Sequence, residues 1–386
     1  MISRHIADKL QQFETPFYLY DMGLLRQTLE SVVYESKRYG YKVHYAIKAN
    51  YDDRILAAIK EYGLGIDCAS GNELAKAIEM GFDPKGIVYA GVGKRDKEIS
   101  YAIDQEILAI NCESIEELTV VDEISRSKGK VTNVALRINP DIDPKTNHCI
   151  DTGQADSKFG ISYEEVMENA EMIQALKNLN IIGIHLHIGS QIRELHVFEN
   201  MCNKVNVIVE NLVKLGFSFD FIDVGGGLGV NYDVPENEPI PNFASLFSIV
   251  NNYLKVGDRD VHFEFGRSIV AECGELITKI LYNKTTATGR RLLIVDGSMT
   301  ELVRPAMYGS YHNIENVTAE DGVTKKYTVV GTACESTDVF AENISLKVSK
   351  RGDLLTLKSA GAYGMSMASR YNLHDLPGAI YSDQIE

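Results

Sequence analysis

The chain has 386 residues, of which 45% are hydrophobic and 24% are charged, and its formal net charge is −15. These proportions are typical of a globular protein, and the length allows two domains, one of them a barrel of about 250 residues. The negative charge argues against nucleic acid and anionic membrane surfaces as partners, because both recruit basic patches. It leaves open a small anionic ligand, which individual side chains would recognise.

The N-terminal segment and the cysteines indicate a cytoplasmic protein. Residues 1–21 carry scattered charges and no apolar core, so we expect no signal peptide. No apolar run approaches the ~18 residues that span a membrane. The six cysteines are dispersed and include no CxxC pair, which is typical of reduced thiols rather than of a disulfide framework.

Eight short apolar runs of strand type alternate with segments of helical periodicity. The intervening segments 52–63 and 71–82, for example, have apolar residues at helix spacing and a glycine at or near the end. Eight strand–helix units predict an α/β fold, a (β/α)8 TIM-type barrel over residues 25–270, and an open doubly wound sheet is the rival. The eight runs are 41–48, 64–70, 86–91, 107–114, 133–140, 181–190, 221–227 and 261–267.

The pattern changes after about residue 270, where strands and turns replace long helical segments. Strand-like runs lie at 291–299, 326–334, 344–349 and 353–369. They predict a C-terminal β-sandwich or β-barrel-like domain. Because residues 15–21 are also strand-like and precede the first barrel unit, we expect the N-terminal strand to join this domain. The β domain would then comprise residues 1–24 and 271–386.

Lys48 follows the first apolar run, in the stretch VHYAIKAN (43–50). A lysine at the end of a strand ordinarily extends its ammonium group into water. Alternatively, a lysine whose amine is kept neutral by desolvation can attack a carbonyl group and form a Schiff base. Lys48 alone does not distinguish these two interpretations, so the other residues at the strand ends are needed.

Polar residues stand at the C-terminal ends of the other predicted strands. In a barrel these ends share one face, where active sites are built. We therefore expect one site to gather a lysine, acidic groups, a histidine, arginines and three adjacent glycines. The residues are Lys48, Asp67, Asn111, Arg137, His187 with Ser190, Gly225 to Gly227, and Glu264 with Arg267.

The glycines in DVGGGLGV (223–230) expose backbone N–H groups that suit a phosphate, although a tight strand-to-helix turn explains them as well. The dinucleotide motif GxGxxG is absent. His185 and His187 would share one face of a strand, as in some zinc sites. We expect no metal, because no other cluster completes a metal shell. His187 is then either a core histidine or a residue that lies flat against a planar cofactor.

Glu264 needs a cationic partner if it is buried at this face. Arg267 could be that partner, and so could the protonated nitrogen of a pyridine ring. A lysine for a Schiff base, a carboxylate for a pyridinium and glycines for a phosphate together describe pyridoxal 5'-phosphate. This combination explains why Lys48 stands at the end of a strand.

Nine motifs in order give the chain a family resemblance over nearly its whole length. They are YAIKAN, DCASGNEL, TGQADSKFGI, HLHIGSQI, DVGGGLG, EFGRSIV, RPAMYGSYH, CEST and AGAYGMSMAS. With these motifs the chain resembles the fold-type III pyridoxal-phosphate-dependent decarboxylases. Within that family it looks like the members that convert meso-2,6-diaminopimelate to L-lysine and CO2, the last step of lysine biosynthesis. The family fold agrees with a barrel and a β domain.

The resemblance implies a role for each matching residue. Lys48 carries the cofactor as a Schiff base, His187 stacks on its ring and Glu264 pairs with its pyridinium nitrogen. Cys334 is the expected proton donor, reaching the active site across the interface of a homodimer with shared sites. Further cofactor contacts are expected from Asp67, Ser190, Gly225, Gly226, Gly227, Gly266, Arg267 and Tyr363. Substrate contacts are expected from Arg267, Arg304, Tyr308, Glu335 and Tyr363.

Three alternatives remain open. The first is a pyridoxal-phosphate-dependent decarboxylase of another basic amino acid (ornithine, lysine or carboxynorspermidine). A substrate of the ornithine type has no distal carboxylate and so does not need Arg304, whereas diaminopimelate needs cations for that carboxylate and an acid such as Glu335 for its ammonium. The second is a non-catalytic cofactor carrier, which lacks the β domain. The third is a metal-dependent barrel hydrolase built around His185 and His187.

Overall fold

The structure, a computed structural model, describes residues 4–142, 157–320 and 322–385 and divides the chain into two compact units. The barrel unit comprises Leu29–Gly229 and Asn242–Gly266. The β unit comprises Met1–Thr28, Val230–Pro241 and Arg267–Glu386. The sequence prediction places Val230–Pro241 within the barrel, whereas the structure groups this segment with the β unit. Part of the motif TGQADSKFGI (152–161) lies outside the described residues, and Cys149 lies outside them as well.

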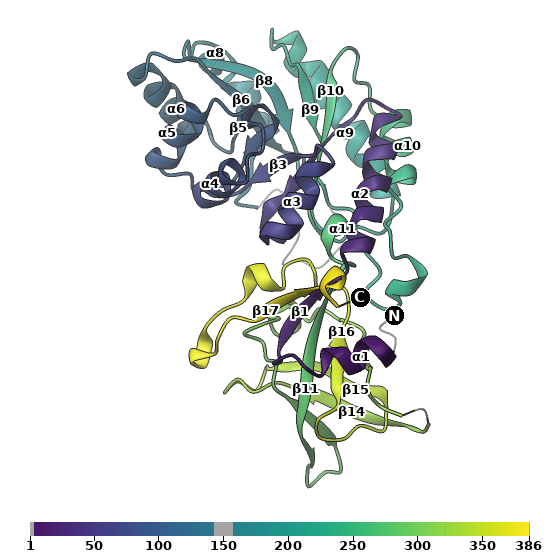
Figure 1. Ribbon diagram of the computed structural model, residues 1–386. Coiled ribbons are helices and arrows are strands. Elements are labelled where there is room, and N and C mark those ends of the chain that lie inside the picture. Colours follow the sequence, from purple (N-terminus) through teal and green to yellow (C-terminus); the bar gives the residue numbers. More distant parts are fainter. Residues whose placement is uncertain (1–3, 143–156, 321, 386) are drawn as a thin grey trace. The chain divides into compact units, whose positions relative to one another are not determined.

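The barrel unit is a closed ring of eight parallel strands, as predicted (Figure 1). Each strand pairs with its neighbour along the chain, and β10 closes the ring by pairing with β2. The strands are buried on both faces, which explains their nearly continuous apolar sequences. They are β2 (Lys42–Ala46), β3 (Gly65–Cys68), β4 (Ile87–Tyr89), β5 (Ala109–Cys112), β6 (Thr132–Asn139), β8 (Leu179–His185), β9 (Phe221–Asp223) and β10 (Asp260–Phe265). A short β7 (Ile161–Ser162) pairs in parallel with the end of β6.

Helices surround the strands, and side-chain caps set where several of them begin. Asp52 accepts hydrogen bonds from the backbone of Arg54 and Ile55 at the start of α3 (Asp53–Glu61). Ser70 and Ser114 cap α4 (Gly71–Glu79) and α6 (Ile115–Ser127), each with a glutamate three residues later that bonds back to the chain. The other helices with residues in this unit are α2 (Met22–Lys37), α5 (Asp96–Gln105), α7 (Tyr163–Glu168), α8 (Ala170–Gln174), α9 (His196–Lys214) and α10 (Phe243–Tyr253).

The β unit contains one mixed sheet of eight strands. Its strands are β1 (Phe17–Tyr20), β11 (Gly274–Thr285), β12 (Arg291–Val295), β13 (Ile314–Asn316), β14 (Thr324–Val330), β15 (Val339–Lys347), β16 (Leu354–Leu357) and β17 (Gly378–Tyr381). The sequence analysis misses three of them, β11, β13 and β17. The unit also has three helices, α1 (Arg4–Leu10), α11 (Arg267–Val270) and α12 (Arg304–Tyr308).

The N-terminal strand belongs to the β unit, as predicted. β1 pairs antiparallel with β11 and parallel with β17, with Phe17 opposite Ile277. These two side chains share a buried cluster with Leu10 of α1 and Leu354 of β16. Burial of the apolar residues of TPFYLY against strands far along the chain therefore fixes the N-terminus in this sheet.

Two features bear on the expected environment. No helix in the described part of the chain combines the length and the apolar character needed to cross a membrane. Of the cysteines in that part, Cys68, Cys112, Cys202 and Cys273 are buried and free, and Cys334 is exposed and free.

Candidate active site

Lys48 faces an acid at the C-terminal end of the barrel strands. It lies in the short helix η1 (Ile47–Ala49) directly after β2, and its Nζ is 2.7 Å from Oδ2 of Asp67 on the neighbouring strand β3. The register of the two strands, with Ala46 opposite Asp67, brings these residues together. Asp67 is fully buried. Its burial is the main reason why the pKa of its carboxyl group is raised, and the negative charge of Glu264 adds to the effect. Its Oδ1 has no hydrogen-bond partner among the described residues.

A second group of buried polar side chains forms around Glu264 of β10. Nε2 of His185 lies 3.1 Å from Oε2 of Glu264, and Asp223 of β9 lies beside them. One ligand atom from each of the three residues falls within 4.8 Å of the others, so the group has the geometry to hold a metal ion. This cluster is not predicted from the sequence, where no second group of ligands completes a metal shell. His187, the other residue of the proposed zinc pair, is not part of it.

Glycines 225–227 pack closely against the backbone of the neighbouring strands. Gly225 and Gly227 have φ angles of 68° and 101°, which favour glycine, and a Cβ atom on Gly226 would overlap the carbonyl oxygen of Glu264. The backbone N–H of Gly225 donates to Oδ1 of Asp223 at 2.9 Å. Strand packing therefore requires these glycines, whatever their backbone N–H groups also bind.

His187 lies beside the glycines and stays neutral. The backbone N–H of Gly226 donates to its Nδ1 at 3.3 Å, so the neutral ring carries its proton on Nε2. Burial, together with Arg137 and Lys48, lowers the pKa of His187 to about 3. A neutral imidazole suits contact with a planar ring better than an imidazolium would next to these cations. Ser190, three residues further along, is half-buried.

Two other predicted strand-end residues have different surroundings. Arg137 pairs with Glu113 at 2.7 Å, and the oxygens of Glu113 also accept hydrogen bonds from the backbone of Gly91 and Gly160. Arg137 therefore ties the ends of neighbouring strands together. Asn111 is fully buried, and neither atom of its amide group has a hydrogen-bond partner in the described part of the chain.

In the β unit, two arginines converge on one tyrosine hydroxyl. The hydroxyl of Tyr232 accepts hydrogen bonds from Arg267 at 2.5 Å and from Arg304 at 2.9 Å. Arg304 also donates to Nε2 of His312 at 3.0 Å, and Nδ1 of His312 donates to the carbonyl of Lys358 at 2.8 Å. Burial, together with Arg304, lowers the pKa of His312 to about 3, so its ring is neutral.

Arg304 is a buried cation whose hydrogen bonds go to neutral groups. It is 4% exposed and forms no ion pair with any carboxylate among the residues that the structure describes. Burial, together with repulsion from Arg267, lowers the pKa of its guanidinium group below the ordinary value. A buried charge without a counter-ion is costly, so Arg304 suits an anionic ligand.

Tyr363 and Tyr308 belong to the same unit. The guanidinium group of Arg267 lies 4.9 Å from the ring centre of Tyr363. Tyr363 has a φ angle of 57°, a conformation that is strained for a tyrosine and that occurs often at functional sites. Tyr308 ends α12, and its side chain is half-buried.

Cys334 and Glu335 lie on an exposed loop of the β unit. The backbone N–H of Cys334 donates to Oδ1 of Asn372 at 2.9 Å, and the hydroxyl of Tyr371 donates to Glu335 at 2.5 Å. Asp338 fixes the loop by accepting hydrogen bonds from the backbone of Ala333 and Met299. The structure thus shows both side chains at the surface of this unit.

Four residues of these clusters have no role in the predicted cofactor and substrate site, although His185 is considered as a zinc ligand. His312 and His185 could have been predicted, because they belong to the motifs RPAMYGSYH and HLHIGSQI. Asp223 starts the glycine motif, but only the barrel register shows that it lies beside Glu264. Tyr232 had no sequence signal, since its partners are 35 and 72 residues away.

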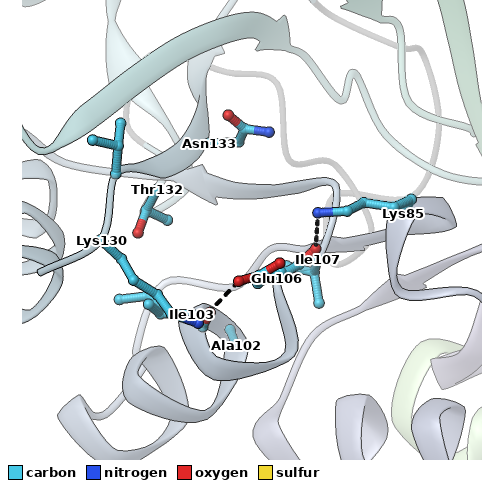
Figure 2. Close-up of a pocket in the computed structure, with 9 residues that line it drawn as sticks. Lys85, Ala102, Ile103, Glu106, Ile107, Lys130, Thr132 and Asn133 are labelled. Carbon is cyan, nitrogen blue, oxygen red and sulfur yellow. Dashed lines mark hydrogen bonds and ion pairs between the residues drawn. The ribbon is translucent and has the colours of Figure 1, made fainter. Parts of the chain in front are cut away.

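The barrel unit also has a cavity at the opposite ends of its strands (Figure 2). Its volume is about 300 Å³, and Lys85, Thr132 and Asn133, at or just before the starts of their strands, help to line it. Both lysines of the cavity bond to Glu106: Lys130 pairs with its carboxylate at 3.1 Å, and Lys85 donates to its backbone carbonyl at 2.7 Å. This cavity therefore lies apart from Lys48 and Glu264.

Comparison with known proteins agrees with the residue-level picture. Residues 26–271 match the family described as pyridoxal-dependent decarboxylase, pyridoxal binding domain. A diaminopimelate decarboxylase of Bacteroides thetaiotaomicron is 44% identical over 98% of both chains, and one of Aquifex aeolicus is 38% identical over 95% of this chain and 86% of the relative.

Solved structures give the same result. The crystal structure of diaminopimelate decarboxylase from Helicobacter pylori complexed with L-lysine superposes with a TM-score of 0.89 at 36% identity. The match covers 97% of this chain and 93% of that one. The resemblance inferred from the nine motifs is therefore confirmed.

Proposed function

The chain belongs to the family of pyridoxal-dependent decarboxylases, and on this basis we propose that it decarboxylates meso-2,6-diaminopimelate to L-lysine and CO2. The observation that carries the substrate assignment is the buried Arg304, which lies beside Arg267 and forms no ion pair among the described residues. The substrate has an amine and a carboxylate at each end. Its non-reacting carboxylate supplies an anion for Arg304.

The residues of the barrel fit the cofactor, pyridoxal 5'-phosphate. Lys48 is the point of attachment, with Asp67 beside its amine. Glu264 has one oxygen without a partner among the described residues, which suits the cationic ring nitrogen, and His187 presents a neutral ring for stacking. When bound, the cofactor supplies a ring that accepts the electron pair left by the departing CO2. The proposed phosphate and further contacts are Ser190, Gly225, Gly226, Gly227, Gly266, Arg267 and Tyr363.

The remaining roles concern the substrate and its proton. Arg267 and Arg304 bind the distal carboxylate, with Tyr308 and Tyr363 as further contacts, and Glu335 binds the distal ammonium. After loss of CO2 the α-carbon needs a proton, and the thiol of Cys334 donates it. Cys334 and Glu335 act at the site of a partner chain in a homodimer, and the exposure of both side chains supports this proposal.

The first prediction concerns Lys48. The purified protein should be yellow, and borohydride should fix the cofactor irreversibly to the peptide that contains Lys48, as detected by mass spectrometry. The Lys48→Ala variant should lose the label, whereas Lys85→Ala, at the other end of the barrel, should keep it. A label on a different lysine would overturn the cofactor assignment. Stoichiometric metal with no visible absorbance would instead favour the metal-dependent hydrolase.

The second prediction concerns the distal carboxylate. Arg304→Ala should lower kcat/KM for meso-diaminopimelate roughly 30-fold to several-thousand-fold, because removing one partner of a buried charge pair costs about 2–5 kcal/mol. The ratio of kcat/KM for diaminopimelate to that for L-lysine, tested as a substrate, should fall as well. Arg38→Ala, which changes an exposed arginine, is the control and should leave both values unchanged.

CO2 release from a panel of diamino acids measures this preference. The unmodified protein should act on diaminopimelate and only very slowly on ornithine or lysine, since such substrates bring no distal carboxylate to Arg304. Efficient turnover of ornithine, lysine or carboxynorspermidine would replace the proposed substrate with that amino acid.

The third prediction concerns shared sites. Lys48→Ala and Cys334→Ala should each be nearly inactive. When the two variants are unfolded and refolded together in equal amounts, half of the dimers are mixed, and each mixed dimer has one intact site if the sites are shared. Activity should then return to ~25% of wild type. Refolded dimers without any recovered activity would show that Cys334 does not act across the interface.

A further inference from the structure

The barrel register brings His185, Asp223 and Glu264 together on three neighbouring strands. His185 of β8 is directly opposite Asp223 of β9, and Asp223 is opposite His262 of β10. Glu264 is two residues beyond His262, so its side chain leaves the strand on the same face. The three side chains are 1%, 0% and 6% exposed, respectively.

The hydrogen bonds locate the protons of this cluster. An ionised carboxylate can only accept hydrogen bonds, so the Nε2–H group of His185 donates a hydrogen bond to Oε2 of Glu264. Oδ1 of Asp223 accepts from the backbone of Gly225, and therefore a proton on this carboxyl group belongs on Oδ2. Oδ2 of Asp223 and Oε1 of Glu264 both lack a partner among the described residues. A proton on Oδ2 of Asp223 would donate to Oε1 of Glu264 and satisfy both atoms, and Oε1 would keep a second lone pair for the ring nitrogen.

The charges around the cluster agree with that placement. Two adjacent ionised carboxylates in a buried site would repel each other. Burial and the charge of Glu264 raise the pKa of Asp223. Burial also acts to raise the pKa of Glu264. His185 and Lys48 outweigh this effect, so the pKa of Glu264 is lowered. The other titratable groups that act on the cluster are Asp67 of β3, His44 of β2, His187 after β8 and His262 of β10.

We propose that Asp223, in its neutral acid form, and His185 both donate hydrogen bonds to Glu264 and thereby keep Glu264 ionised against the ring nitrogen of the cofactor. The two residues are positioning residues, since each acts through Glu264. The proposal rests on the proposed function, because it concerns the residue assigned to the pyridinium nitrogen. It also accounts for the burial of three polar side chains that form no ion pair with any other residue that the structure describes.

The test measures the protonation of the ring nitrogen directly. The holoenzyme is loaded with cofactor that carries ¹⁵N in the ring, and its ¹⁵N chemical shift is followed with pH. In the wild type the ring nitrogen should stay protonated at neutral pH. In Asp223→Ala and His185→Leu, which remove one donor each, the pH of deprotonation should fall by about one to two pH units.

Conservative variants separate donation from charge and from folding. Asp223→Asn and His185→Gln keep an N–H donor at the same place, so both should behave as the wild type does. If Asp223→Asn shifts the deprotonation as far as Asp223→Ala does, Asp223 acts as an ion and the proposal is wrong. If the alanine variant does not fold, Asp223→Asn is compared with the wild type instead, and a fall of one pH unit or more would refute the proposal. Stoichiometric metal in the purified protein would overturn it too, because metal binding requires both carboxylates ionised.

The outcome for the wild type separates this inference from the proposed function. A wild type that binds no labelled cofactor refutes the proposed function itself. A wild type whose ring nitrogen is protonated, with all four variants unchanged, leaves that function standing and refutes only the roles of Asp223 and His185.

Discussion

Asp67, Asp223 and Glu264 are buried at the C-terminal ends of β3, β9 and β10, and the chemistry of the barrel unit follows from how their charge is compensated. Lys48 faces Asp67, and His185 faces Glu264. Because an ionised carboxylate is costly away from water, the unit must either retain protons or bind a cation. A cofactor with a cationic ring nitrogen and an attachment to Lys48 meets that requirement.

The β unit has the opposite requirement. Arg267 and Arg304 are buried around one neutral tyrosine, and Arg304 makes no ion pair among the described residues. The barrel therefore presents acids for a cationic ring, while the β unit presents cations for a carboxylate. A substrate that is an amino acid at both ends has the groups to match, which is why the specificity is assigned to the β unit rather than to the barrel.

Much of the barrel could be predicted from the sequence, because fully buried parallel strands leave continuous apolar runs with a polar residue after each. The missed β11 reads GELITKILYNKT. Its C-terminal part is largely exposed and polar, so the strand lacks such a run. Side chains with a role at the strand ends were partly predictable from residue type alone. Tyr232 and Asp223 were not, because their importance arises from contacts that only the folded register creates.

Arg304 is a buried cation without an ion pair among the described residues, and we expect a ligand carboxylate to neutralise it. Thermal unfolding of the wild type and of Arg304→Met, with L-lysine or with the diamine 1,5-diaminopentane, which lacks the carboxylate, tests it directly. We expect L-lysine alone to raise the Tm of the wild type, and we expect Arg304→Met to be at least as stable as the wild type without ligand and to lose this shift. Equal stabilisation of the wild type by the diamine, or an undiminished shift in Arg304→Met, would contradict the account.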